Sequence, residues 1–237
     1  MTISVNQPIG EIVIEHPEIV PMLERLGIDY CCGGKHTLSE ACADRKLETA
    51  AIADELERQQ KGPDSQTVRW EKVPLKELAE YIVQRHHVFT RKQLELIGSL
   101  ADKVERRHGI NHPELFQIST AIDAIRTELA HHFAHEESVV FPYIAQLEMN
   151  EPPALPLVYG SVRQPVERML TDHDHTGSEL RLVREITNNY QPPADACPSY
   201  RALYRALEDL EQDLHQHIHL ENNILFPRAL EQAKERA

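Results

Sequence analysis

The chain has 237 residues, of which 41% are hydrophobic and 27% are charged, a profile typical of a folded chain rather than a disordered one. Its formal net charge of −13 argues against binding to nucleic acid, which needs clustered Lys and Arg, and against an anionic membrane surface. The sequence has no apolar run of membrane-spanning length and begins without the basic segment of a signal peptide, so we expect a cytoplasmic protein.

The first section of the chain predicts a small helical domain. Short apolar clusters, which indicate short helices, lie at residues 9–14, 19–26 and 38–42, and a helical stretch follows at 47–60. Gly62-Pro63-Asp64-Ser65 then breaks the pattern. We therefore place a domain boundary there, with one domain at 1–62 and a second at 70–237.

The second domain predicts four long helices. Their apolar positions recur in steps of three and four residues over about 75–107, 113–147, 165–188 and 198–234. A proline-rich connector, Glu151 to Pro156, separates the second helix from the third. The fold class is therefore all-α, with a four-helix bundle preceded by a small helical domain.

The second and fourth helices repeat one motif, H-x3-E-x4-F-P. It begins at His132 with Glu136 and again at His217 with Glu221, 85 residues later. Both prolines come late in a helical run, where a kink is expected. His132, Glu136, His217 and Glu221 all lie on the apolar stripe that faces the core. Because buried carboxylates are costly, commonly by several kcal/mol per ion, the pattern predicts a compensating cation.

The first and third helices each add a histidine to the same interior. His173 lies on the stripe of the third helix, and the adjacent His86 and His87 both touch the stripe of the first. A lone histidine followed by H-x3-E thus occurs twice, which predicts a two-fold pseudosymmetric site with four His and two Glu. Imidazole and carboxylate without thiolate favour iron or manganese over zinc, and two bridging carboxylates are how bundle cores hold two irons.

Other residues near this site carry weaker signals. His131 with His135, and His215 with His219, have chelating H-x3-H spacing but lie off the stripe by about 100° or more, which favours solvated histidines. Glu128, one turn before His132, is either a proton carrier or partner of a ligand, or an ordinary partly exposed glutamate.

The Asp29-Tyr-Cys-Cys-Gly-Gly34 segment places two adjacent thiols, Cys31 and Cys32, on a glycine-flanked loop. Adjacent cysteines are poorly spaced to hold one metal together. An exposed loop of this kind suits redox exchange or contact with another protein's metal centre. The alternative is that one or both thiols pack under the short helices.

The double-cysteine segment and the repeated H-x3-E-x4-F-P bundle together resemble the repair-of-iron-centres family (ScdA/YtfE type), which is hemerythrin-like. The resemblance covers nearly the whole chain, including Leu220 to Leu230 and Thr187 to Asn189. It implies a hemerythrin-like bundle with two non-haem irons, carboxylate-bridged and with an oxo or hydroxo bridge. The implied ligands are the six stripe residues, with His87 chosen over His86: His87, His132, Glu136, His173, His217 and Glu221.

The resemblance also implies a purpose, namely repair of iron–sulfur clusters damaged by nitrosative or oxidative stress. Iron donation, reduction of nitric oxide and removal of nitrosyl groups are the implied activities. The candidate catalytic residues are Cys31 and Cys32, which match the family's paired cysteines, and Glu128, from its position one turn before His132. The expected partners are proteins with damaged clusters, and the expected small ligands are nitric oxide or dioxygen. A homodimer through the N-terminal section is a further hypothesis. The rival functions are a dioxygen or nitric oxide carrier or sensor without repair activity, and a purely structural bundle.

Overall fold

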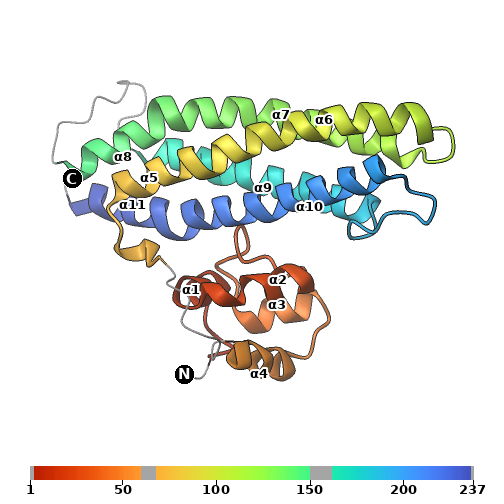
Figure 1. Ribbon diagram of the computed structural model, residues 1–237. Helices are drawn as coiled ribbons and strands as arrows, with labels where there is room; N and C mark the ends of the chain where they lie inside the picture. Colours follow the sequence, from red (N-terminus) through yellow and green to blue (C-terminus); the bar gives the residue numbers. More distant parts are fainter. Residues whose placement is uncertain (1–2, 60–67, 150–161, 236–237) are drawn as a thin grey trace. The chain divides into compact units, whose positions relative to one another are not determined.

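The computed structural model describes residues 3–59, 68–149 and 162–235. Helices account for the regular structure of these residues, which include no strand and only one isolated β-bridge, between Pro8 and Thr37. The predicted all-α class is therefore confirmed. Figure 1 labels the helices along the chain. By their internal contacts the residues form two compact units, Met1–Leu78 with His215–Ala237, and Ala79–Leu214.

The first unit begins with four short helices that match the predicted apolar clusters. They are α1 (Ile9–Glu15), α2 (Val20–Leu26), α3 (Leu38–Asp44) and α4 (Thr49–Gln59), with a 3-10 turn at Pro17–Ile19. Helix α2 stops because Gly27 takes a left-handed conformation, with φ of +63°. Helix α3 starts at a capping box, in which Thr37 and Glu40 each bond the other's backbone N–H.

A separate apolar core holds these helices together. Its members are almost fully excluded from solvent, and those with no exposure are Ile9, Ile19, Leu23, Leu38, Cys42 and Leu56. The same unit contains the last residues of α10 (Pro198–Leu220), a π-helical turn at Glu221–Leu225 and α11 (Phe226–Glu235). After a 3-10 turn at Trp70–Lys72, the chain enters α5 (Leu75–Tyr81).

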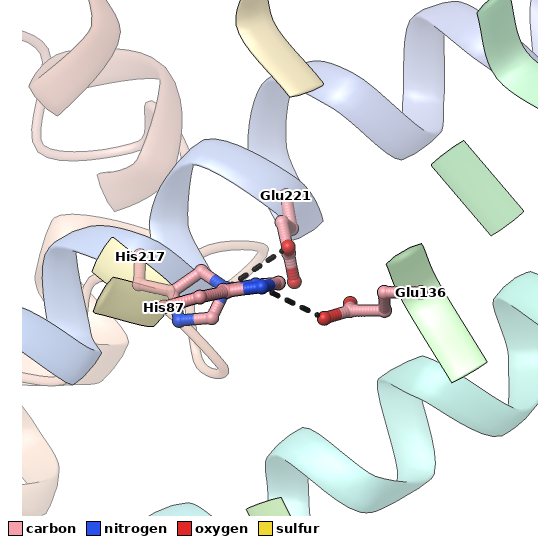
Figure 2. Close-up of side chains that lie close together, drawn as sticks. All are labelled: His87, Glu136, His217 and Glu221. Carbon is pink, nitrogen blue, oxygen red and sulfur yellow. Dashed lines mark hydrogen bonds and ion pairs between the residues drawn. The ribbon is translucent and has the colours of Figure 1, made fainter. Parts of the chain in front are cut away.

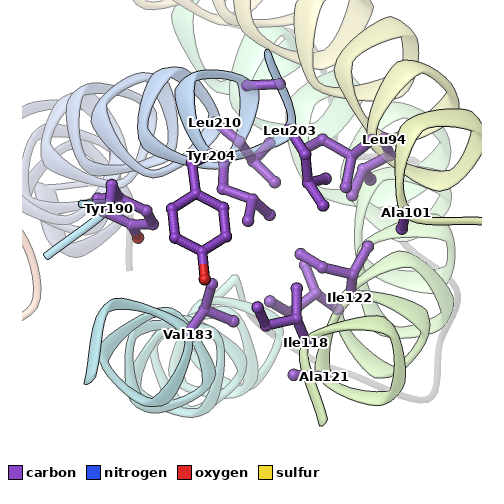
Figure 3. Packing of buried hydrophobic residues seen from close by; sticks show 14 of the residues in the cluster. Leu94, Ala101, Ile118, Ala121, Ile122, Val183, Tyr190, Leu203, Tyr204 and Leu210 are labelled. Atoms are coloured by element: carbon purple, nitrogen blue, oxygen red, sulfur yellow. The ribbon is translucent and has the colours of Figure 1, made fainter. Parts of the chain in front are cut away.

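The second unit contains the predicted four-helix bundle as far as Leu214 of α10. Its long helices are α6 (Val88–His108), α7 (Glu114–His135), α9 (Arg163–Ile186) and α10 (Pro198–Leu220), and α8 (Phe141–Glu148) extends the line of α7. Figure 3 shows how Leu94, Ile122, Val183 and Leu203 from the four helices meet in one apolar core. The stripe of threes and fours forms this core because it puts one side of each helix inward.

Three π-helical turns interrupt the bundle helices, at Ile82–His87, Glu136–Val140 and Glu221–Leu225. The second and third directly precede Phe141-Pro142 and Phe226-Pro227, where the sequence predicts a kink. A proline cannot donate the usual backbone hydrogen bond, and a widened turn accommodates this loss. Each π turn begins or ends at a predicted metal ligand: His87, Glu136 or Glu221.

The predicted boundary at Gly62 to Ser65 and the connector at Glu151 to Pro156 lie outside the described residues. The division into domains at 1–62 and 70–237 therefore stays a prediction. Among the described residues, no helix combines the length and apolar character needed to span a membrane.

The contribution of the bundle core can be measured on one helix. Leu94 and Leu96 both belong to α6, with exposed fractions of 4% and 49%. We expect Leu94→Ala to lower the free energy of unfolding by about 2–5 kcal/mol because it leaves a cavity. Leu96→Ala is the matched control, with an expected change within about 0.5 kcal/mol. Urea denaturation followed by circular dichroism measures both, and equal losses would contradict the assigned core face.

Candidate metal centre

Glu136 lies between two histidines in the interior of the bundle. His87 ends the first π turn, His132 lies in the last turn of α7, and Glu136 begins the next π turn. Nε2 of His87 is 3.3 Å from Oε2 of Glu136, and Nε2 of His132 is 3.2 Å from Oε1. The side chains of His87 and Glu136 have no solvent exposure. Each oxygen of this buried carboxylate thus faces an imidazole nitrogen.

Helix α9 supplies His173 to the same interior. Its Nε2 atom lies 3.0 Å from Nε2 of His132, and both rings are buried. Two imidazole nitrogens that face each other at this distance need a proton or a cation between them, since two lone pairs repel. This contact is therefore an observation that fits a bound ion.

The second motif has the same local geometry near the end of α10. Nε2 of His217 is 3.0 Å from Oε1 of Glu221, and the two side chains are 1% and 0% exposed. His217 stands one helical turn before Glu221, so the i, i+4 spacing brings both onto one face.

Two overlapping groups of potential ligands result. One comprises His87, Glu136, His217 and Glu221; the other comprises His132, Glu136, His173 and Glu221. In each group, one ligand atom from every residue lies within 4.8 Å of the others. Figure 2 shows the carboxylates of Glu136 and Glu221 directed toward the imidazoles of His87 and His217. Both groups share the two glutamates, which is the arrangement that two ions bridged by two carboxylates require.

Acidic side chains form hydrogen bonds with the Nδ1 atoms of two of these histidines. Oε1 of Glu137 is 2.7 Å from Nδ1 of His87 and also accepts from the guanidinium of Arg91 at 2.9 Å. Oδ2 of Asp172 is 3.4 Å from Nδ1 of His132. A carboxylate at Nδ1 keeps the proton there and leaves the Nε2 lone pair directed inward, as metal-binding histidines require.

These contacts shift the pKa values of the acidic partners. Burial disfavours the charged form of Glu137, but its hydrogen bonds with His87 and Arg91 outweigh burial and lower its pKa. The hydrogen bond with His132 is the main cause that lowers the pKa of Asp172. Both partners therefore stay ionised and keep their acceptor role at neutral pH.

All six predicted ligands lie in the two groups, although their assignment as ligands stays a prediction. His86, the alternative to His87, has a different position. Its Nδ1 atom is 3.1 Å from Oδ2 of Asp213, in a buried pair. His86 belongs to neither group of potential ligands found among the described residues.

The expectation of solvated histidines is correct for His131 and wrong for His219. His131 is exposed, but His219 is only 6% exposed, with its ring 5.6 Å from that of Tyr30. His215 is partly buried and pairs with Glu24, at 2.9 Å. The N-terminal helices cover this face of α10 within the first unit, which a helical periodicity cannot reveal. Burial lowers the pKa of His219 to about 4, so this ring is neutral.

Glu128 forms an ion pair on the surface of the bundle. Its Oε2 atom is 2.8 Å from Nδ1 of His175, and the two side chains are 23% and 62% exposed. The hydrogen bond with Glu128 raises the pKa of His175. This geometry supports the partly exposed alternative, and a role for Glu128 in proton transfer stays a prediction.

The cysteine loop is more closed than expected, because Cys31 is only 4% exposed while Cys32 is partly exposed. Oδ1 of Asp29 accepts from the backbone N–H of Cys31 and Gly33, at 3.1 and 2.9 Å, and from the Cys31 thiol at 3.3 Å. The hydrogen bond with Cys32, followed by burial, raises the pKa of the Cys31 thiol well above its usual range. Their Sγ atoms are 4.0 Å apart, too far for a disulfide.

Asn223 joins this loop to the helix that carries His217 and Glu221. Its Nδ2 atom donates to the carbonyl oxygens of Tyr30 and Cys31, both at 3.2 Å, within the first unit. A Cβ atom on Gly34 would approach Oδ1 of Asn223 to 2.5 Å, and one on Gly10 to 2.7 Å. The two glycines therefore make room for this side chain.

Sequence reasoning missed Asn223, Glu137 and Asp172. A signal for Asn223 is present, because the second motif has Asn223 where the first has Ser138. The second copy of the motif therefore has an amide side chain, which bonds the cysteine loop, at the position where the first copy has a serine. The other two residues are ordinary acidic side chains next to predicted ligands, and their sequence positions reveal no partner.

A buried cluster of histidines and shared glutamates in a four-helix bundle defines a cation-binding helical protein. Residues 78–229 match the family model described as the hemerythrin HHE cation binding domain, and residues 5–60 match ScdA_N, described as a domain of unknown function (DUF542). The bundle and the cysteine loop thus fall in two different family models.

Curated relatives match nearly the whole chain. It is 37% identical to the iron–sulfur cluster repair protein YtfE of Musicola paradisiaca, covering 95% of this chain and 96% of the relative. It is 36% and 34% identical to proteins of the same name from Pectobacterium atrosepticum and Escherichia coli O157:H7, covering 95% of this chain and 97% of each relative. The chain belongs to the hemerythrin-like repair-of-iron-centres family of the YtfE type.

The acidic partner of His87 offers a test of the centre. We expect Glu137→Ala to weaken metal binding by about 10- to 100-fold, because the His87 ring loses the acceptor that orients it. Competition with a ferrous chelator measures the affinity. Glu95→Ala, at an exposed position on α6, is the matched control. Equal affinities for both variants and the unmodified protein would show that Glu137 has no part in the site.

Proposed function

We propose that this protein holds two non-haem iron ions in its bundle and repairs iron–sulfur clusters damaged by nitrosative or oxidative stress. The observation that carries the proposal is the pair of overlapping His and Glu groups that share Glu136 and Glu221. The name of the curated relatives, iron–sulfur cluster repair protein, supports the purpose, since they match 95% of this chain.

The donor set supports iron at both positions. One ion would take His87 and His217, the other His132 and His173, with Glu136 and Glu221 as bridges. These six residues supply about eight protein–metal bonds, while two irons prefer about five or six each, so coordination positions remain for an oxo or hydroxo bridge and a small ligand. Bound iron would supply a redox centre with open positions for nitric oxide or dioxygen.

The residues around the centre have distinct roles in this proposal. Glu137 and Asp172 hold the rings of His87 and His132 with their Nε2 atoms inward. The partly exposed Cys32 offers a thiol to a client protein, while the buried and protonated Cys31 supports it from 4.0 Å away. Iron donation and the handling of nitric oxide are both compatible with this arrangement.

A dioxygen or nitric oxide carrier or sensor would need the same bundle. The closed cysteine loop favours repair, because Asp29 accepts three hydrogen bonds within it and Asn223 donates two to its carbonyl oxygens. A carrier has no use for such a loop. The homodimer, the cytoplasmic location and the choice between nitric oxide and dioxygen stay predictions from the sequence.

The metal content tests the centre directly. We expect about two irons per chain after anaerobic reconstitution, and loss of both in the Glu136→Ala, Glu221→Ala double variant, because the two carboxylates bridge the ions. Iron is measured by elemental analysis together with the visible absorption of the oxidised centre. Retention of both irons by the double variant, in a chain that keeps its helical circular dichroism, would exclude the bridging assignment.

The thiols are tested separately from the iron. We expect the Cys31→Ala, Cys32→Ala double variant to keep its two irons but to lose recovery of a cluster-dependent dehydratase inactivated by nitric oxide. The reason is that the iron ligands include neither thiol, whereas contact with a damaged cluster suits a thiolate. Enzyme activity recovered over time is the measurement.

Cys197→Ala is the matched control for this experiment, because Cys197 is a partly buried cysteine beside the bundle core and far along the chain from the loop. It should repair at the rate of the unmodified protein. Unchanged repair by the double variant would exclude a role for the two thiols in repair. A dioxygen or nitric oxide carrier or sensor would then be the better-supported function.

A further inference from the structure

A second group of potential metal ligands lies at the other end of α6. His108 is the last residue of α6, His112 lies in the turn before α7, and Asp195 lies in the loop between α9 and α10. One ligand atom from each residue lies within 4.8 Å of the others. The 21 residues of α6 separate this group from His87, a rise of about 30 Å. It is therefore distinct from the centre described above.

His112 is oriented as a metal-binding histidine would be. Its Nε2 atom is 3.1 Å from Oδ2 of Asp195, and its Nδ1 atom is 2.8 Å from Oε1 of Glu114. The Tyr200 hydroxyl donates to the same Glu114 oxygen at 3.2 Å and fixes it in turn. A carboxylate at Nδ1 with Nε2 directed at a second ligand is the pattern that Glu137 and His87 have in the main centre.

His108 supplies the second, independent observation. Its Nε2 atom is buried and has no hydrogen-bond partner among the residues that the structure describes. The ring lies against neighbours that hold it in place, with centroids 6.1 Å from His112 and 5.4 Å from Tyr200. A buried polar atom without a partner in a native protein calls for an unseen water or ion.

Protonation of His112 alone does not account for the group. Its hydrogen bonds with Asp195 and then Glu114 raise the pKa of His112, which is what an imidazolium between two carboxylates would show. A protonated His112 would pair with Asp195 and Glu114, but Nε2 of His108 would still lack a hydrogen-bond partner among the described residues. A metal ion would satisfy all three side chains at once.

We propose that His108, His112 and Asp195 bind one divalent transition-metal ion of the zinc class, with Glu114 as the positioning residue behind His112. Two imidazoles and one carboxylate with a fourth position open are a common ligand set of zinc. The site borders solvent, since the Asp195 side chain is 62% exposed. The ion would join the α9–α10 loop to the turn between α6 and α7, fastening this end of the bundle.

The test uses full-length protein whose main centre is filled with iron, and zinc chloride as the probe. Isothermal titration should show one zinc ion bound per chain in addition to the irons, with the iron content unchanged. His108→Gln and Asp195→Asn should each abolish this binding, and Glu114→Gln should weaken it by about 10- to 100-fold. His16→Gln is the matched control, because His16 also pairs with a carboxylate, Glu18, at 3.2 Å but belongs to none of the groups of potential ligands found among the described residues.

A second measurement separates this site from the main centre. In the Glu136→Ala, Glu221→Ala background, zinc should still raise the melting temperature, since a ligand that binds only the folded state stabilises it. The increase should disappear when Asp195→Asn is added. The proposal is overturned if the iron-filled protein binds no zinc, or if His108→Gln and Asp195→Asn bind it as the unmodified protein does.

Discussion

Two glutamate carboxylates without solvent exposure, Glu136 and Glu221, are the constraint on which the bundle depends. A buried charge of this kind is tolerated only when it is compensated, and the compensating charge that we propose is metal ions bound by these carboxylates together with four histidines. Each helix of the bundle region meets this requirement with a histidine on its inner face. The carboxylates of Glu137 and Asp172 then hold two of these rings from behind. These contacts orient the rings of His87 and His132 so that the lone pairs of their Nε2 atoms point into the bundle.

The helices and the six ligand candidates could be predicted because both follow from periodicity. A ligand must face the interior, so His132 and Glu136 continue the apolar stripe, and the repeat at His217 and Glu221 argues against coincidence. Periodicity could not separate His86 from His87, since both are buried. A π turn at Ile82–His87 shifts the helical phase at this point, and a pattern of threes and fours does not predict it.

The remaining features depend on pairings between distant segments. The burial of His219 follows from contact with the N-terminal section, where its ring lies 5.6 Å from that of Tyr30. The bond between Glu24 and His215 likewise joins residues that are 191 positions apart in sequence. Asn223 likewise bonds a loop far from it in sequence and needs two glycines to do so. Composition and spacing describe one helix at a time, so they carry no signal for such contacts.

The π turns have a consequence for how this chain can change length. A π turn holds one residue more than an α turn, so residues after it are rotated by about 100° relative to a continuous α-helix. The turn at Glu136–Val140 lets His132 before it, Glu136 at its start, and Ile144 and Leu147 after it all point inward. If the same residues formed a regular α-helix, one of these two flanks would be rotated by about 100° toward the surface. Deleting a single residue from the turn would instead restore a regular helix and keep both flanks inward, so this is the place where the helix can lose a residue without disturbing the proposed ligands.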